Sequence, residues 1–76
     1  MREKKRSGRD SDTEARILSA ARAVFIRNGT AGARMQEIAE EAGVNQALVH
    51  YYFRTKDQLA QAVFRDVAAR LVAAII

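Results

Sequence analysis

Residues 45–52 combine amide, imidazole and phenol side chains that can form hydrogen bonds with a nucleic acid. Gln46 and His50 lie four positions apart, so a helix places both on one face. A glutamine amide can pair bidentately with adenine, an imidazole can bond a guanine edge, and Ala47 can contact a thymine methyl group. With Asn45 just before them, these residues form a group suited to contacting base edges.

Two short helices joined by a glycine must position this group. The spacing predicts one helix over residues 35–42, ended by Gly43, which can adopt the left-handed conformation. Asn45 can cap the next helix, which extends to about Tyr52 or Phe53. This is the arrangement of a helix-turn-helix, whose second helix enters the major groove. An ordinary helical hairpin is the alternative, but it leaves the exposed aromatic and hydrogen-bonding side chains unexplained.

An apolar stripe predicts a longer helix before this pair. The helix should begin at Asp12 or Thr13, run to Asn28 and stop at Gly29. Its apolar residues recur at helical spacing and are interpreted as core rather than as a cofactor site. They are Ile17, Leu18, Ala21, Val24 and Phe25.

A fourth helix is predicted to follow residue 55. Thr55 and Gln58 have the spacing of a capping box. The apolar positions of the helix are Leu59, Val63, Val67, Leu71 and Ile75. The expected fold is therefore all-α, a small four-helix bundle with a homeodomain-like helix-turn-helix.

The charge of the chain is concentrated at its N-terminus. Residues 1–10 hold five basic and two acidic residues, which is +3 of the net +4 of the chain. A segment so poor in apolar residues cannot offset its ordering entropy, so residues 1–11 are expected to form a disordered basic arm. Such an arm can remain a solvated tail, or it can follow phosphates or enter the minor groove.

Composition excludes several classes of site. The chain has no cysteine and one histidine, which rules out a disulfide framework and makes a metal site improbable, and no cofactor is expected. The N-terminus lacks the apolar region of a secretory signal, and the last apolar run is shorter than the ~20 residues of a membrane span. The protein is therefore expected to be soluble and cytoplasmic.

Two functions other than DNA binding are alternatives for this sequence. An enzyme would need His50 to pair with Ser7, Ser11 or Ser19, yet no glycine elbow surrounds any of these serines. A helical dimerisation or membrane-surface module is the stronger alternative, because the arm is basic and the last turn is apolar. That module leaves the turn at Gly43 unexplained.

Several motifs carry a resemblance to a known family. They are Phe25-Ile26-Arg27-Asn28-Gly29, Met35-Gln36-Glu37-Ile38-Ala39, Ala42-Gly43-Val44 and the run from His50 to Leu59, in which Tyr51-Tyr52-Phe53 and Thr55-Lys56 are the most specific. From about Thr13 to Phe64 the chain resembles the DNA-binding domain of the tetracycline-repressor (TetR) family of bacterial transcriptional regulators.

The resemblance implies roles for residues outside the base-reading group. Tyr51, Tyr52 and Lys56 match family positions that contact the DNA backbone. Arg34 stands where the family usually has a capping serine or threonine; it cannot cap, but it can reach a phosphate. His50 replaces a frequent tyrosine, so the target sequence cannot be taken from a relative.

The resemblance also implies a larger protein. Residues 12–55 would be the DNA-binding domain, and residues 56–76 a truncated connector to an absent ligand-binding and dimerisation domain. The whole protein would be a ligand-responsive repressor that binds a palindromic operator as a homodimer, with its small-molecule effector bound by the missing domain. The operator, the regulated genes, the effector and the choice between repression and activation stay open. The cluster Leu71, Val72, Ile75 and Ile76 is expected to be exposed.

Overall fold

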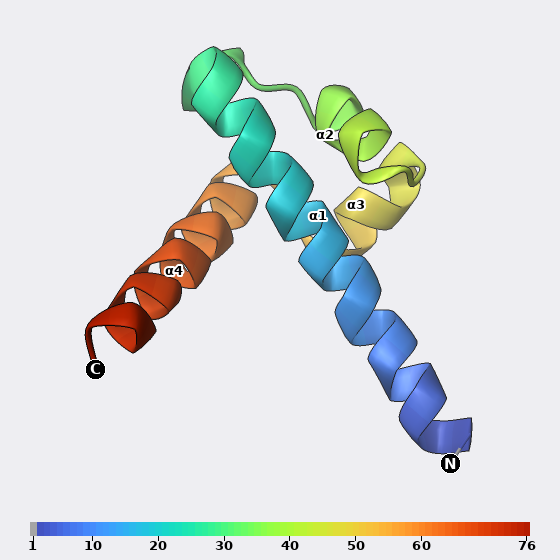
Figure 1. The fold of residues 1–76 in the computed structure, drawn as a ribbon. Helices are drawn as coiled ribbons and strands as arrows, with labels where there is room; N and C mark the ends of the chain where they lie inside the picture. The colour runs from blue at the N-terminus through green and yellow to red at the C-terminus, as the bar shows by residue number, and fades with distance from the viewer. Residues whose placement is uncertain (1) are drawn as a thin grey trace.

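Residues 2–76 form four α-helices in the computed structural model, which describes their backbone and the side chains of residues 12–76 (Figure 1). The helices are α1 (Arg2–Gly32), α2 (Met35–Ala42), α3 (Gln46–Tyr52) and α4 (Lys56–Ile75). The bounds of α2 and α3 agree with those predicted from the sequence. Within the described residues there is no strand, as expected for the all-α class.

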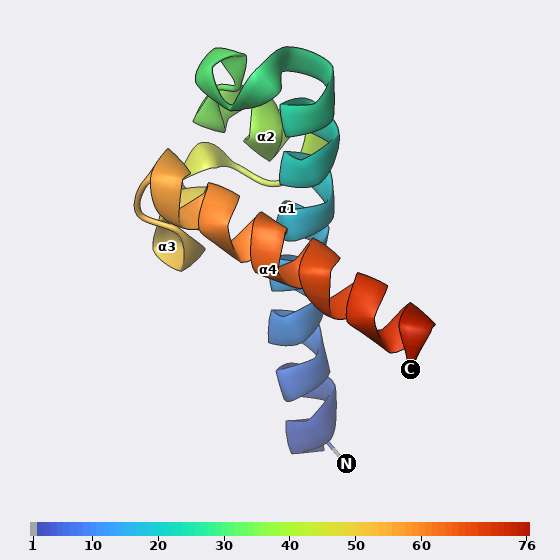
Figure 2. The same cartoon turned by 90° about the vertical axis from the view of Figure 1, so that its left-hand side faces the viewer.

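The long helix α1 is the support for the other three. α2 and α3 lie together along one side of α1, and α4 crosses α1 at a steep angle (Figures 1 and 2). α1 contacts both α2 and α4, whereas α3 packs mainly against α2. The helix-turn-helix is therefore held on α1 chiefly through its first helix.

Apolar side chains, with members from all four helices, form one core. The buried members are Ile17, Ala20, Ala21, Val24, Ala33, Ile38, Ala39, Ala42, Val49, Phe53, Leu59 and Val63. The apolar stripe predicted in the first helix is confirmed, with Leu18 and Phe25 partly buried at its edge. Phe53 follows Val49 by four positions, and both side chains are buried.

The start of α1 differs from the prediction. The helix begins at Arg2 rather than at Asp12 or Thr13, so residues 2–11, expected to be disordered, form its first turns. Met1 lies outside the described residues. The segment has no proline and is rich in Arg and Lys, which favour helix, and extension of an existing helix adds one hydrogen bond per residue.

The end of α1 is interrupted where the sequence predicted a stop. Gly29 has φ 76° and ψ 162°, a conformation that is essentially restricted to glycine. The chain then makes one further turn, which ends at Gly32. This break redirects the backbone toward α2.

The second half of α4 leaves the core. Leu59 and Val63 are buried, whereas Leu71 and Ile75 are 63% and 77% exposed. The expected exposure of the apolar cluster formed by Leu71, Val72, Ile75 and Ile76 is confirmed. α4 therefore contributes its first half to the domain.

Replacing Gly43 with alanine should destabilise the turn between α2 and α3. Gly43 has φ 76°, and the N–H groups of Gly43 and Val44 donate to the carbonyls of Glu40 and Ala39, which together form a Schellman motif. A left-handed alanine costs roughly 1–2 kcal/mol. An alanine Cβ would also lie 3.1 Å from a guanidinium nitrogen of Arg16. Urea unfolding followed by circular dichroism measures the change.

Gly32→Ala is the matched control for Gly43→Ala. Gly32 is not in the left-handed region, and a Cβ there would meet Asn28 at 3.6 Å, an ordinary contact. The urea concentration at the unfolding midpoint of Gly32→Ala should stay the same or rise slightly, because alanine reduces the entropy of the unfolded chain. Equal losses in both variants would contradict a conformational role for Gly43.

Candidate nucleic-acid interface

The N-terminus of α3 is fixed by Asn45. Its Oδ1 accepts a hydrogen bond from the backbone N–H of Leu48 at 2.8 Å, which confirms the predicted cap. The oxygen of Asn45 is thus used to hold the helix, while its amide N–H groups remain as donors toward a ligand.

The outer face of α3 carries the predicted base-reading residues. Gln46, Ala47 and His50 are exposed, while Val49 on the inner face is fully buried. Gln46 Nε2 and His50 Nε2 are 3.4 Å apart, so the two polar side chains form a pair on this face. The second ring nitrogen, His50 Nδ1, lies 3.4 Å from the carbonyl oxygen of Arg54.

The two tyrosines differ in their surroundings. Tyr51 is 76% exposed and meets Tyr52 edge to face, with ring centroids 5.1 Å apart. Tyr52 is half-buried against the core and lies tilted beside Phe53. Tyr51 is consequently the ring that presents most of its surface to a ligand, whereas Tyr52 also serves packing.

Lys56 has a structural contact that the sequence did not predict. Its Nζ donates to the carbonyl oxygens of Ala33 at 2.9 Å and Ala31 at 3.2 Å. The ammonium group therefore ties the start of α4 to the segment between α1 and α2. The sequence offered no signal for this contact, because the partners lie more than twenty positions away.

Residues next to Lys56 complete the start of α4. The hydroxyl oxygen of Thr55 accepts from the N–H of Gln58 at 3.1 Å, which confirms the predicted cap. The Gln58 side chain accepts from the N–H of Arg54 rather than from Thr55, so the second bond of the capping box is displaced by one residue.

Arg34 lies at the start of α2 with an extended backbone and an exposed side chain. The Arg34 side chain, which lies within the described residues, makes no capping hydrogen bond to α2, as expected from the sequence. Together with Gln36, Glu37 and Glu40 it lines a shallow surface hollow. Its guanidinium is therefore presented to solvent beside two carboxylates.

Arg16 is a second basic residue whose role the sequence did not reveal. Its guanidinium donates to the carbonyl oxygen of Ala42 at 2.8 Å and so closes the C-terminus of α2 onto α1. A cation at this end of a helix also interacts favourably with the helix dipole. This bond fixes the turn that begins α3.

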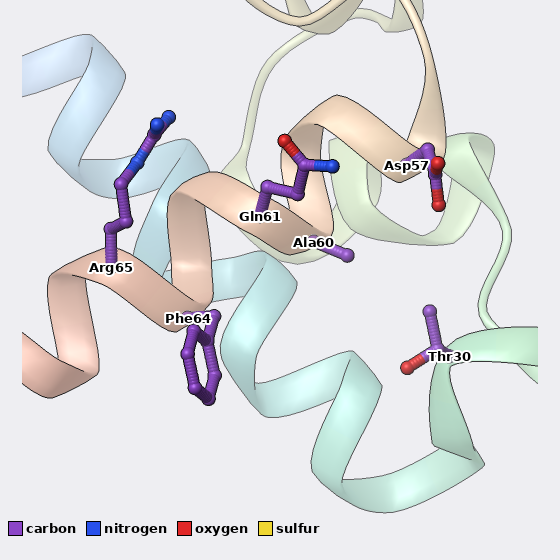
Figure 3. Close-up of a pocket in the computed structure, with 6 residues that line it drawn as sticks. All are labelled: Thr30, Asp57, Ala60, Gln61, Phe64 and Arg65. Atoms are coloured by element: carbon purple, nitrogen blue, oxygen red, sulfur yellow. The ribbon is translucent and has the colours of Figure 1, made fainter.

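Another hollow lies between the end of α1 and the first half of α4 (Figure 3). It is lined by Thr30, Asp57, Ala60, Gln61, Phe64 and Arg65. Figure 3 shows the Phe64 ring at its edge, and this side chain is 75% exposed. In residues 12–76 there is no group of three His, Cys, Asp or Glu side chains that could hold a metal ion. Within the described part of the chain, no helix is both long and apolar enough to cross a membrane.

Residues 17–63 match the family model described as bacterial regulatory proteins of the tetR family. The chain belongs to the TetR family. The match covers all the helix-turn-helix and the parts of α1 and α4 that form the core. The resemblance inferred from the sequence motifs is thereby confirmed.

Individual TetR-family relatives support the same assignment. The chain is 47% identical over 51 residues, 67% of its length, to the HTH-type transcriptional repressor SCO4008 of Streptomyces coelicolor. It is 43% identical over 63 residues, 83% of its length, to the HTH-type transcriptional regulator RutR of Escherichia coli K12. A crystal structure of an HlyIIR mutant protein superposes over 75% of the chain with a TM-score of 0.74 and 42% identity.

These TetR-family relatives are longer than the chain. The aligned region covers 27% of SCO4008, 30% of RutR and 31% of the HlyIIR chain. The similarity therefore concerns the helix-turn-helix domain of each relative.

Proposed function

We propose that residues 12–55 bind double-stranded DNA in a sequence-specific manner, as the DNA-binding domain of a bacterial transcriptional regulator. The observation that carries the proposal is the exposed outer face of α3, where Gln46, Ala47 and His50 lie opposite the buried Val49. A recognition helix needs this division between a free polar face and an anchored apolar face. Membership of the TetR family supports it.

Four residues are assigned to base edges and four to the DNA backbone. Bases are contacted by Asn45, Gln46, Ala47 and His50. The backbone is contacted by Arg34, Tyr51, Tyr52 and Lys56. The exposed guanidinium of Arg34 and the exposed ring of Tyr51 are well suited to phosphates. Lys56 donates to two carbonyls and keeps a third N–H for a phosphate oxygen.

For the whole protein we propose a ligand-responsive repressor that acts in the cytoplasm as a homodimer on a palindromic operator. The names of the relatives, repressor and regulator, support this role. A small-molecule effector would bind a domain other than the one described here. No enzymatic activity is proposed.

Selection of bound DNA from a random pool, followed by sequencing, tests the proposal. At moderate salt, the selected DNA should share a defined sequence motif that corresponds to the half-site bound by one recognition helix. Recovery of unrelated sequences, together with binding to anionic vesicles in the absence of DNA, would instead favour the membrane-surface module.

Removal of residues 1–9 should flatten the salt dependence of DNA binding without unfolding the domain. The segment carries a net charge of +4, from five basic residues and one acidic residue, and each phosphate contact contributes roughly 0.9 to the slope of log affinity against log salt. The slope is obtained by fluorescence anisotropy over a salt series, with circular dichroism as the folding control.

A variant that keeps residues 1–9 separates charge from chain length. It carries glutamine in place of Arg2, Lys4, Lys5, Arg6 and Arg9. It should reproduce the flattened slope of the truncated protein. An unchanged slope in both proteins means that the arm makes no phosphate contact.

A further inference from the structure

Both ring nitrogens of His50 lie beside polar groups at hydrogen-bonding distance. Nδ1 is 3.4 Å from the carbonyl oxygen of Arg54, just beyond the end of α3. Nε2 is 3.4 Å from the amide nitrogen of Gln46, one turn earlier in α3. The imidazole thus connects the first turn of α3 to the backbone that follows the helix.

These two contacts are compatible with one state of the ring. A carbonyl oxygen can only accept, so Nδ1 must carry the hydrogen. In a neutral imidazole, Nε2 then holds a lone pair and accepts a hydrogen bond. The partner at that position is the amide nitrogen of Gln46, which donates one of its two N–H groups.

The pair leaves on Gln46 the groups that a base edge requires. After one N–H is given to His50, the amide retains a second N–H donor and its carbonyl oxygen Oε1. Adenine offers N7 as acceptor and N6–H as donor, which one donor and one acceptor on the same amide can satisfy together. We propose that His50 is a positioning residue that holds the Gln46 amide in the orientation that pairs with adenine. In this arrangement both ring nitrogens are engaged, so His50 contributes to base reading through Gln46 rather than through a hydrogen bond of its own to a base.

Protonation of His50 should remove this orientation. An imidazolium has an N–H at both ring positions. The N–H at Nε2 then faces the N–H groups of Gln46, and two donors cannot form a hydrogen bond. The amide is expected to rotate and offer Oε1 to His50, which exchanges the places of donor and acceptor toward the base. The preference for adenine is then reduced, while the added positive charge strengthens binding to every sequence.

Two carboxylates near α3 are paired with a guanidinium. α2, which packs against α3, carries Glu37 and Glu41, both paired with Arg27. Its remaining carboxylate, Glu40, lines the hollow beside Arg34. On the side of α3 itself, the titratable neighbours of His50 in sequence are Tyr51 and the guanidinium of Arg54. Among the described residues, none of these side chains is hydrogen-bonded to the imidazole.

The inference rests on the proposed DNA binding. It is tested at the base pair that Gln46 contacts, which is the position of the DNA site where Gln46→Ala relaxes the base preference. Affinities for oligonucleotides with adenine or another base at that position are compared at constant salt, at pH ~8 and at pH ~5. The wild-type preference for adenine should fall by roughly 3- to 10-fold at the lower pH, the range that one hydrogen bond supports. His50→Phe keeps a ring but has no nitrogen; it should show the reduced preference at both pH values.

A spectroscopic measurement separates this inference from DNA binding as such. In the free protein, the side-chain amide signals of Gln46 should differ between the two pH values, and they should not differ in His50→Phe. If adenine is preferred equally by wild type and His50→Phe at both pH values, the positioning role is wrong while the proposed function stands. A wild-type protein without sequence preference at pH ~8 contradicts the proposed function itself.

Discussion

Replacing Leu59 with alanine should lower the free energy of unfolding by about 2–5 kcal/mol, the usual cost of removing a fully buried leucine side chain. Leu59 is 0% exposed and belongs to the core that joins α4 to the rest of the domain. A 76-residue chain has a total stability of only about 4–11 kcal/mol at 0.05–0.15 kcal/mol per residue. The variant should therefore lose a large part of its stability, as measured by urea unfolding monitored by circular dichroism.

Leu71→Ala provides the comparison for Leu59→Ala. It makes the same chemical change in the same helix, but Leu71 is 63% exposed. Its unfolding free energy should change by less than about 0.5 kcal/mol, as is usual for surface positions. Similar losses in the two variants would show that the second half of α4 belongs to the folded core.

Replacing Gln46 with alanine should weaken binding to the preferred DNA site by about 1–3 kcal/mol and relax base preference at one position. The side chain is exposed on the outer face of α3, so the substitution removes a base contact without altering the core. Competition binding with single-base variants of the selected site measures both effects.

Gln61→Ala is the control for Gln46→Ala. Gln61 is an exposed glutamine of α4, at the hollow between α4 and the end of α1 (Figure 3). Its loss should leave affinity and preference unchanged. If Gln46→Ala weakens binding to all sequences alike, Gln46 contacts the backbone rather than a base.

Features of the fold set by neighbouring residues could be predicted from the sequence. Gly43 ends α2 in the left-handed conformation, and Asn45 and Thr55 cap the helices that follow them. Each of these outcomes depends on a backbone conformation and on a partner within a few positions. The same local reasoning gave the apolar face of α1.

Contacts between distant segments could not be predicted in this way. The bonds from Arg16 to Ala42 and from Lys56 to Ala33 join residues 26 and 23 positions apart. Both lysine and arginine are common on solvated surfaces, and only the packing of helices brings these cations to free carbonyl groups. The contact of His50 Nδ1 with the carbonyl oxygen of Arg54 spans only four positions, but it depends on how the chain leaves α3 at Phe53, whose backbone is extended at φ −136°.

The way in which α3 is attached to the domain affects how easily its exposed face can change its DNA target during evolution. Of the seven residues of α3, all within the described part of the chain, Val49 alone is buried. Substitutions at the exposed positions should therefore alter target choice at little thermodynamic expense, because they touch no core contact. Copies of this domain that arise by gene duplication could acquire substitutions on the exposed face of α3 and bind new DNA sites while the helices stay folded. Recognition and stability can therefore evolve separately.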